Sequence, residues 1–279
     1  MRKNIFITGC SSGIGRALAL AFHKLGCRVI ATARRLDSIS DLQDMGMAIF
    51  CLDVTDKGQS KNVVETVLTN EKRIDVLINN AGYALIGPSI ELPSQELSMQ
   101  FETNVMAPLF LAKLVAPSMK QNGHGVIVNI GSISGITTTP FSGAYCASKA
   151  ALHALSDALR MELSAFSIHV MTVQPGSIQS DFGNAACKTI SRVLGSNSWY
   201  IPVKKYIEAR AGVSQDNATP ADEFAQKVAA EIMSENPKPI LRIGKMSWML
   251  PLMKKVIPTS MLDGILKGKF GLSKDSGLG

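Results

Sequence analysis

Long apolar runs, linkers and any ordered cysteine pattern are missing from this sequence of 279 residues. Its five cysteines are scattered, odd in number and never spaced Cys-xx-Cys, which argues against a disulfide framework or a zinc site and for a reducing compartment. No apolar stretch reaches the roughly 18–20 residues that a helix needs to cross a bilayer. No Pro/Gly/Ser-rich segment or internal repeat divides the chain, so we expect one large α/β domain.

The start of the chain, its charge and its histidines restrict the expected location, partners and cofactors of the protein. Residues 1–4 run straight into the first expected strand, so we expect no signal peptide and a cytoplasmic protein. The net charge is +7, and the segment 238–279 alone holds eight basic and two acidic residues. Since the rest is almost neutral and has no basic stripe, we expect no nucleic-acid partner. The four histidines form no ligand pattern and are assigned to packing or the surface, and we expect no metal.

Apolar runs alternate with helical patterns along the chain, which predicts βαβ units and a parallel sheet. The strands are expected near residues 4–8, 28–33, 47–52, 74–79, 125–130, 168–173 and 239–243. The helices are expected near residues 14–25, 37–45, 57–70, 95–121, 144–165 and 220–235. Several polar motifs follow these strands, and open α/β sheets bind ligands at the carboxyl ends of their strands.

A glycine-rich turn follows the first expected strand and reads Thr8-Gly9-Cys10-Ser11-Ser12-Gly13-Ile14-Gly15. Glycines let the backbone approach a pyrophosphate, and the N-terminus of the following helix offers unpaired N–H groups to the anion. A plain tight turn is the alternative. The same residues also match Gly-x-Ser-x-Gly, which presents the nucleophile of serine hydrolases, here Ser11. An elbow on the first strand leaves no earlier strand for the oxyanion loop, which speaks against a hydrolase.

Tyr145 and Lys149 stand four residues apart, thirteen residues after Ser132. On a helix, positions i and i+4 share one face, so the phenol and the ammonium are expected side by side. The cation favours the phenolate and is expected to lower the tyrosine pKa toward the working range, which makes Tyr145 a candidate general acid–base catalyst. The alternative is a packed ring beside a solvated ammonium.

The glycine-rich turn and this pair together resemble the short-chain dehydrogenase/reductase family in its common single-domain type. The family's Thr-Gly-xxx-Gly-x-Gly is matched at residues 8–15, its Asn-Asn-Ala-Gly at 79–82 and its Pro-Gly at 175–176. Its catalytic asparagine, serine and Tyr-xxx-Lys are matched by Asn104, Ser132, Tyr145 and Lys149. These motifs occur in the family's order and cover the chain from residue 3 to about 178.

The resemblance implies a Rossmann-type, doubly wound parallel sheet of seven strands in the order 3-2-1-4-5-6-7, with helices on both faces, within residues 1–244. It implies that Tyr145 exchanges a proton with the substrate, that Lys149 lowers the tyrosine pKa and binds the nicotinamide ribose, and that Ser132 bonds the substrate oxygen. Asn104 would hold a water that links Lys149 to solvent. A homodimer or homotetramer built from the helices near 95–121 and 144–165 is also implied. Because some relatives of this fold lost the tyrosine, a non-catalytic NADP-binding sensor is the alternative.

The second expected strand ends in Ala31-Thr32-Ala33-Arg34-Arg35, without the acid that bonds the ribose 2′-OH in NAD sites. An arginine fork suits a 2′-phosphate, so we expect NADP (NADPH) as the cofactor. Asp37 is the rival ligand for a 2′-OH, and Asp53 either lines the adenine pocket or caps the helix that begins near Thr55. The residues expected to bind the cofactor are Gly9, Ser11, Ser12, Gly13, Ile14, Gly15, Arg34, Arg35, Asp53, Val54, Asn80, Ala81, Gly82, Tyr145, Lys149, Pro175 and Gly176.

The segment 177–219 is long, and the resemblance implies that this loop is the substrate lid. It and the loops at 83–87 and 135–141 are largely apolar, which indicates an apolar substrate, although a lid packed on its own domain would look similar. Residues 8–15 and 31–35 look closest to the branch with hydroxysteroid and retinol dehydrogenases and acyl-dihydroxyacetone-phosphate reductase. We therefore expect a carbonyl–alcohol oxidoreductase acting on a steroid, retinoid, fatty aldehyde or acyl-lipid ketone.

The C-terminal segment, residues 245–279, interleaves large apolar residues with lysines. Pro251 and Pro258 are expected to break it into helical pieces too short to span a membrane. An apolar face edged by lysines suits the interface of an anionic bilayer, to which each lysine adds about 1 kcal/mol. The alternative is that the apolar residues cap the substrate pocket, and both roles can hold together.

Overall fold

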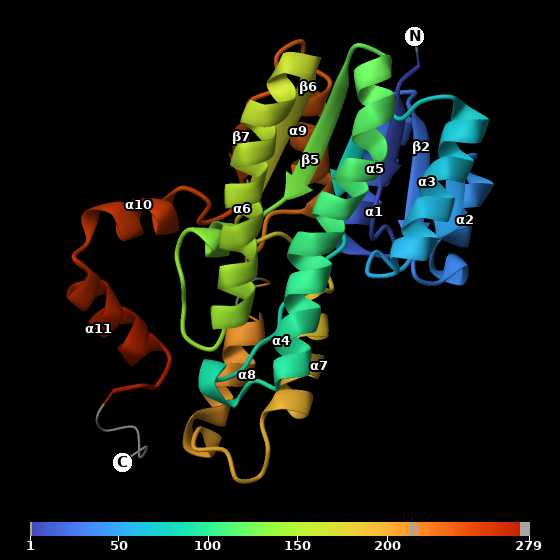
Figure 1. The fold of residues 1–279 in the computed structure, drawn as a ribbon. Coiled ribbons are helices and arrows are strands. Elements are labelled where there is room, and N and C mark those ends of the chain that lie inside the picture. The colour runs from blue at the N-terminus through green and yellow to red at the C-terminus, as the bar shows by residue number, and fades with distance from the viewer. Residues whose placement is uncertain (1, 213–214, 216, 274–279) are drawn as a thin grey trace.

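Seven parallel strands form one sheet in the computed structural model, which describes residues 2–212, 215 and 217–273 (Figure 1). The strand order is β3-β2-β1-β4-β5-β6-β7, as predicted. The strands are β1 (Asn4–Ile7), β2 (Arg28–Ala33), β3 (Ala48–Cys51), β4 (Val76–Asn79), β5 (Gly125–Ile130), β6 (Ile168–Pro175) and β7 (Ile240–Ile243). All of them lie close to their expected ranges.

Helices cover both faces of the sheet because its central strands are apolar on both sides. In β1, Ile5 and Ile7 pack on one face and Phe6 on the other, since successive side chains of a strand alternate. The first face is covered by α1 (Gly13–Lys24), α2 (Ser40–Asp44) and α9 (Ala221–Ile232). The second face is covered by α3 (Lys57–Glu71), α5 (Ala107–Gln121) and α6 (Gly143–Leu163). The predicted doubly wound α/β fold is confirmed.

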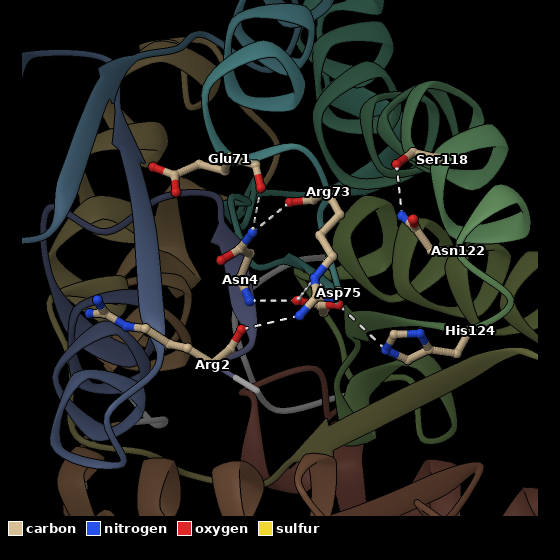
Figure 2. A network of polar contacts seen from close by, with 8 residues as sticks. All are labelled: Arg2, Asn4, Glu71, Arg73, Asp75, Ser118, Asn122 and His124. Carbon is tan, nitrogen blue, oxygen red and sulfur yellow. Dashed lines mark hydrogen bonds and ion pairs between the residues drawn. The ribbon is translucent and has the colours of Figure 1, made fainter.

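A polar network joins β1 and β4 at the edge of the sheet where these strands begin (Figure 2). The buried Asp75 carboxylate accepts a hydrogen bond from the Asn4 backbone N–H at 2.7 Å. Arg73 pairs with the same carboxylate at 3.1 Å, and His124 lies 3.4 Å from it. The Asn4 side chain donates to the backbone carbonyls of Glu71 and Arg73. The buried charge is thereby compensated, and the starts of the two strands are held together.

The long helix expected at 95–121 contains an irregular turn. It begins as α4 (Ser94–Phe101), passes through a π-helical turn at Glu102–Met106 and continues as α5. No proline or glycine lies within residues 102–106, and Pro108 follows only in the first turn of α5, so the periodicity predicted one uniform helix. π turns inside α-helices are frequent at functional sites. Short 3₁₀ turns occur at Leu36–Ile39, Ser89–Glu91, Ile133–Gly135, Ser164–Phe166 and Ile201–Val203.

The expected lid loop is largely helical, which corrects the sequence prediction. It contains α7 (Phe182–Val193) and α8 (Lys204–Gly212). Ile190 and Val193 of α7 are buried at helical spacing, and their partners come from distant parts of the chain. Residues 213–214 and 216 of this segment lie outside the described residues.

The C-terminal segment forms α10 (Met249–Val256) and α11 (Thr259–Lys269), which stand out from the sheet on the side of α6 (Figure 1). Pro258 separates the two helices, as predicted. Pro251 does not break a helix, because it lies in the first turn of α10, where backbone N–H groups have no partner within the helix. No described helix is long and apolar enough to cross a membrane. Residues 274–279 lie outside the described residues.

Candidate active site

A cleft of about 1600 Å³ lies at the carboxyl ends of the strands. It is lined by the loops after β1, β4, β5 and β6 and by residues of α7, α8 and α11. All of the predicted site residues line this cleft except Arg35 and Asn104. The motifs meet there because parallel strands end at the same edge of a sheet.

The loop after β1 presents bare backbone to the cleft. Gly9 and Gly13 have φ angles of +73° and +55°, a left-handed conformation that glycine adopts without strain. At Gly15 an added Cβ would lie 2.2 Å from the Gly9 carbonyl oxygen, so no side chain fits. Ser11 and Ser12 also line the cleft, and α1 begins directly after them. The loop therefore fits an anion such as the pyrophosphate of a dinucleotide.

Hydrogen bonds between the loops after β1 and β4 fix the conformation of this glycine loop. Thr8 Oγ1 accepts hydrogen bonds from the N–H groups of Asn80 and Ala81, both at 3.0 Å. The Asn80 side chain donates in return to the carbonyl oxygens of Thr8 and Gly9 at 2.8 and 3.0 Å. Asn80 thus lines the cleft as predicted, but its amide group is engaged in holding the glycine loop.

The end of β5 and the first turns of α6 bring the catalytic candidates together. Tyr145 and Lys149 are both buried, and Lys149 Nζ lies 6.0 Å from the centre of the tyrosine ring. Ser132 follows β5 and forms a side-chain hydrogen bond with Tyr145. Its Oγ also accepts from the Ser134 N–H at 3.1 Å, so the hydroxyl caps a turn as well. Lys149 Nζ donates to the Ile130 carbonyl oxygen at 2.7 Å, which fixes the ammonium at the end of β5.

The predicted lowering of the Tyr145 pKa is wrong. Burial raises the pKa of Tyr145 to about 12, although the hydrogen bond with Ser132 and the charge of Arg210 act in the opposite direction. Burial also lowers the pKa of Lys149 to about 8. A buried ion loses its hydration, and here that loss outweighs the proximity of the two groups on one helix face.

Asn104 lies in the π turn between α4 and α5 and is buried. Its amide donates to the Tyr83 carbonyl oxygen at 3.0 Å and to Ser148 Oγ at 3.1 Å, and its Oδ1 accepts from the Tyr83 N–H. Both amide hydrogens are therefore engaged, and the side chain ties the π turn to α6. Only Oδ1 has capacity left for the water that the resemblance implies, so that role stays a prediction.

Of the two predicted arginines at the end of β2, only one lines the cleft. Arg34 is exposed and lines the cleft. Arg35 does not line the cleft and lies 3.5 Å from Asp37 in an exposed ion pair. Asp37, the rival ligand for a ribose hydroxyl, does not line the cleft either.

The loop after β3 contributes Asp53 and Val54 to the cleft. Asp53 Oδ1 accepts hydrogen bonds from the Thr55 N–H and hydroxyl at 3.0 and 2.7 Å. The alternative that Asp53 caps the following helix is wrong, because α3 is capped by Asp56, whose side chain accepts from the Gln59 N–H at 2.9 Å.

Two residues near the catalytic candidates were not identified from the sequence. His153 stands one turn after Lys149 on α6, and burial together with the lysine charge lowers its pKa to about 4. Nε2 of the neutral ring accepts a hydrogen bond from the Ser132 N–H at 3.3 Å and so positions the serine. Its four-residue spacing from Lys149 was the available signal. Arg210 lines the cleft from α8, and its place depends on how α8 packs against the rest of the chain.

The cleft does not support the hydrolase alternative. A serine nucleophile needs a base within hydrogen-bond reach, most often a histidine. Ser11 lines the cleft, but none of the four histidines does. The glycine loop is therefore better explained as an anion-binding turn.

Known proteins of similar sequence and structure agree with this geometry. The family described as short chain dehydrogenase matches residues 3–190. The uncharacterized oxidoreductase YbbO of Escherichia coli (strain K12) is 31% identical over 269 residues, which are 96% of this chain and 95% of that protein. The NADPH-dependent 1-acyldihydroxyacetone phosphate reductase of Schizosaccharomyces pombe is 34% identical over 250 residues, 88% of this chain and 80% of that protein. A crystal structure of a short-chain dehydrogenase from Streptomyces avermitilis matches with a TM-score of 0.78 and 30% identity over 95% of this chain and 93% of its own.

The family match covers the glycine loop and the Ser-Tyr-Lys group, and the relatives align over nearly the whole chain. The sheet order and the cleft at its carboxyl edge agree with that match. This chain therefore belongs to the short-chain dehydrogenase family.

Proposed function

We propose that this protein is an NADP(H)-dependent oxidoreductase that interconverts a carbonyl and an alcohol on an apolar substrate. The observation that carries the proposal is the gathering of Tyr145, Ser132 and Lys149 in one cleft with the glycine loop at residues 8–15. A nicotinamide cofactor bound there supplies or accepts the hydride. The side chains of the protein then orient the substrate and move the proton.

Tyr145 is the proton donor in the reducing direction. Since burial raises its pKa to about 12, the phenol stays protonated at neutral pH, which suits a general acid. Ser132 donates a hydrogen bond to the same substrate oxygen and holds it beside the phenol. Lys149, held by the Ile130 carbonyl oxygen at 2.7 Å, places a positive charge near the phenolate that forms.

The end of β2 supports NADP rather than NAD. Arg34 lines the cleft there, and its planar guanidinium matches a 2′-phosphate. Asp37, which would favour a free 2′-OH, pairs with Arg35 instead. The relative from S. pombe is NADPH-dependent by its description.

Replacing Arg34 with Ala is expected to raise the Michaelis constant for NADPH about tenfold or more and to leave that for NADH nearly unchanged. The reason is that a hydrogen bond to a charged group contributes about 1.5–3 kcal/mol. The assay follows the loss of NADPH absorbance with a panel of apolar aldehydes and ketones. Arg35→Ala is the matched control, and the loss of an exposed charge there is expected to change either constant less than about fivefold.

The same assay tests the proposed activity. Wild-type turnover of at least one apolar carbonyl with NADPH is the supporting result. Tight NADPH binding without turnover of any carbonyl would favour the non-catalytic sensor instead. Equal losses with both cofactors in Arg34→Ala would make the arginine structural and remove the NADP assignment.

The lid and the C-terminal segment make the substrate side of the cleft apolar. Phe182 of α7 lines the cleft, and its ring centre lies 5.6 Å from that of Tyr145. Phe270 and Leu266 line it from the C-terminal segment, and Phe270 meets Phe141 edge-on at 6.5 Å. These contacts support a steroid, retinoid, fatty aldehyde or acyl-lipid ketone as substrate, with residues 177–219 as lid and the C-terminal segment as cap.

The opposite side of the C-terminal segment is apolar and exposed. Trp248, Leu252 and Val256 recur at four-residue spacing, with 66%, 59% and 67% of their surface exposed. Met261 and Ile265 of α11 are exposed at the same spacing. Exposed lysines stand among them at positions 254, 255 and 267. This face suits the surface of an anionic bilayer, from which a lipid substrate would enter beneath the cap.

Exchanging both Leu252 and Val256 for Ser is expected to weaken binding to vesicles of phosphatidylcholine and phosphatidylserine at least about tenfold, because burial of one large apolar side chain contributes about 1.5–3 kcal/mol. Pelleting with vesicles at moderate salt measures the effect. Ile90→Ser, which removes an exposed apolar residue outside the segment, is the control. A wild type that does not pellet would leave the segment as a cap only.

We propose that the protein assembles as a homodimer or homotetramer through α4–α6. Light scattering checks that the variants keep the assembly of the wild type.

A further inference from the structure

Arg210 is a charged side chain in the cleft that the proposed proton transfer does not use. It stands in the last turn of α8 and lines the cleft. Its Nε donates to Thr139 Oγ1 at 2.8 Å, and its Nη2 donates to Ser142 Oγ at 3.1 Å. Both acceptors are neutral hydroxyls, so these bonds orient the guanidinium without neutralising it.

No acidic side chain among the described residues lies within ion-pair distance of Arg210. The other arginine of the lid, Arg192, is paired with Glu96 at 3.4 Å. The end of α8 offers Arg210 only the partial negative charge of a helix C-terminus. A guanidinium stays charged at any working pH, and a partly buried charge without a partner is unfavourable. An anion placed beside Arg210 would remove that penalty.

The two hydroxyls form a fixed support for the guanidinium. Thr139 Oγ1 and Ser142 Oγ lie 2.8 Å apart, and Ser142 Oγ is also 3.1 Å from the Thr139 carbonyl oxygen, to which it donates. A guanidinium has five N–H donors, and the bonds to the support use two of them. The remaining donors form a pre-oriented fork of the kind that binds a carboxylate or phosphate. A packing role alone needs no charge, since a neutral donor can make the same two bonds.

Arg210 lies on the side of the cleft where the substrate reacts. Ser142 immediately precedes α6, which carries Tyr145 in its first turn. The charge of Arg210 is near enough to lower the pKa of Tyr145. Its helix neighbours Ile207 and Ala211 belong to the apolar cluster that contains the Tyr145 ring. An anion on Arg210 would thus be part of a molecule that meets Tyr145 and packs against the lid.

We propose that Arg210 binds an anionic group, a carboxylate or a phosphate, that the apolar substrate carries close to its reacting carbonyl. This inference rests on the proposed function and narrows its substrate class to an amphiphile with an acidic head. Lysines at 188, 245 and 269 line the same cleft and add to the positive potential that attracts such a molecule. Neutral aldehydes and ketones of equal chain length are then poorer substrates.

The experiment compares matched pairs of carbonyl compounds with NADPH as the hydride source. One pair is a γ-oxo fatty acid and its methyl ester, and the other is an acylated hydroxyketone phosphate and its dephosphorylated form. In the wild type, kcat/KM is expected to be about tenfold to a hundredfold higher for the charged member of one pair, the factor that a charge-assisted hydrogen bond contributes. The pair that shows this preference distinguishes carboxylate from phosphate. Arg210→Met is expected to abolish the preference mainly through KM while turnover of the neutral member continues.

Two further variants distinguish the loss of the Arg210 side chain from a general disturbance of the fold. Arg210→Lys retains the charge without the fork and is expected to keep part of the preference. Lys204→Met removes an exposed charge from the same helix and is expected to keep all of it. Thermal unfolding shows whether each variant is folded.

Two outcomes overturn the inference and leave the proposed function intact: an unchanged preference in Arg210→Met, or a wild type that reduces both members of each pair equally well. Failure to oxidise NADPH with any compound, charged or neutral, counts against the proposed function instead. In that case, calorimetric binding of the same pairs to the wild type and to Arg210→Met decides the role of the arginine. Equal affinity for charged and neutral members would then reject it.

Discussion

Phenylalanine in place of Tyr145 is expected to lower turnover with NADPH by about two to four decades, the usual contribution of a general acid–base group. The substitution removes only the hydroxyl. The ring can still pack against Phe182, whose centre lies 5.6 Å away, so the fold and NADPH binding are expected to persist. Steady-state turnover of a carbonyl that the wild type reduces measures the first effect, and quenching of protein fluorescence by NADPH measures the second.

The loss is expected to be specific to this hydroxyl. Tyr206→Phe removes a phenol from the apolar cluster around Tyr145, outside the cleft lining, and is expected to leave turnover almost unchanged. Since the pKa of Tyr145 is raised to about 12, its deprotonation should not limit reduction in the neutral pH range. A Tyr145→Phe enzyme within about tenfold of the wild type would mean that another group supplies the proton.

Methionine in place of Lys149 is expected to impair catalysis and yet raise the free energy of unfolding at neutral pH. Burial lowers the pKa of Lys149 from 10.5 to about 8. The folded chain therefore buries a charge that the unfolded chain exposes to water, which is unfavourable by on the order of 3 kcal/mol. Loss of the hydrogen bond to the Ile130 carbonyl oxygen offsets about 1 kcal/mol of the gain.

The pH dependence of stability separates this charge from other effects of the substitution. Between about pH 8 and 10.5 the unfolded lysine still holds its proton, whereas the folded lysine has released it. Because the unfolded state binds more protons in this window, the wild type gains on the order of 2–3 kcal/mol as the pH rises, and Lys149→Met does not. Urea unfolding of both proteins from neutral pH to about pH 10 measures the difference, with the exposed Lys61→Met as control. A difference that stays constant across the window would show that Lys149 is not a buried charge.

The sheet and the glycine loop were predictable because local patterns specify them. Most of the strands are short, mainly apolar runs, and the length and pattern of such runs identify them without knowledge of their neighbours. The turn at residues 9–15 depends on backbone conformations and close approaches that glycine alone allows, as Gly9 and Gly15 show. The meeting of most predicted site residues in one cleft followed from the parallel strands, which end at one edge.

Helices α7 and α8 and the exposed face of the C-terminal segment were not predictable from local patterns. The buried residues of α7 and α8 pack against Phe141 and Phe270, which are distant in the chain. Which residues of α10 and α11 line the cleft and which face outward depends on the same packing. The π turn at 102–106 carries no proline or glycine, and Asn104 satisfies its amide only through Tyr83 and Ser148.

The protonation states and hydrogen-bond partners at the site also depended on the tertiary structure. Tyr145 and Lys149 are neighbours along one helix, and that spacing alone predicted a lowered tyrosine pKa. Burial by segments from elsewhere in the chain reversed it. Arg210 finds its hydroxyl support 71 and 68 residues away, at Thr139 and Ser142. Residue order and glycine placement thus set the strands and the glycine-rich turn, because propensity and alternation act over a few residues. The packing of α7 and α8, the proton affinities and the orientation of Arg210 arise only on folding, because burial and hydrogen-bond partners come from segments far apart in the chain.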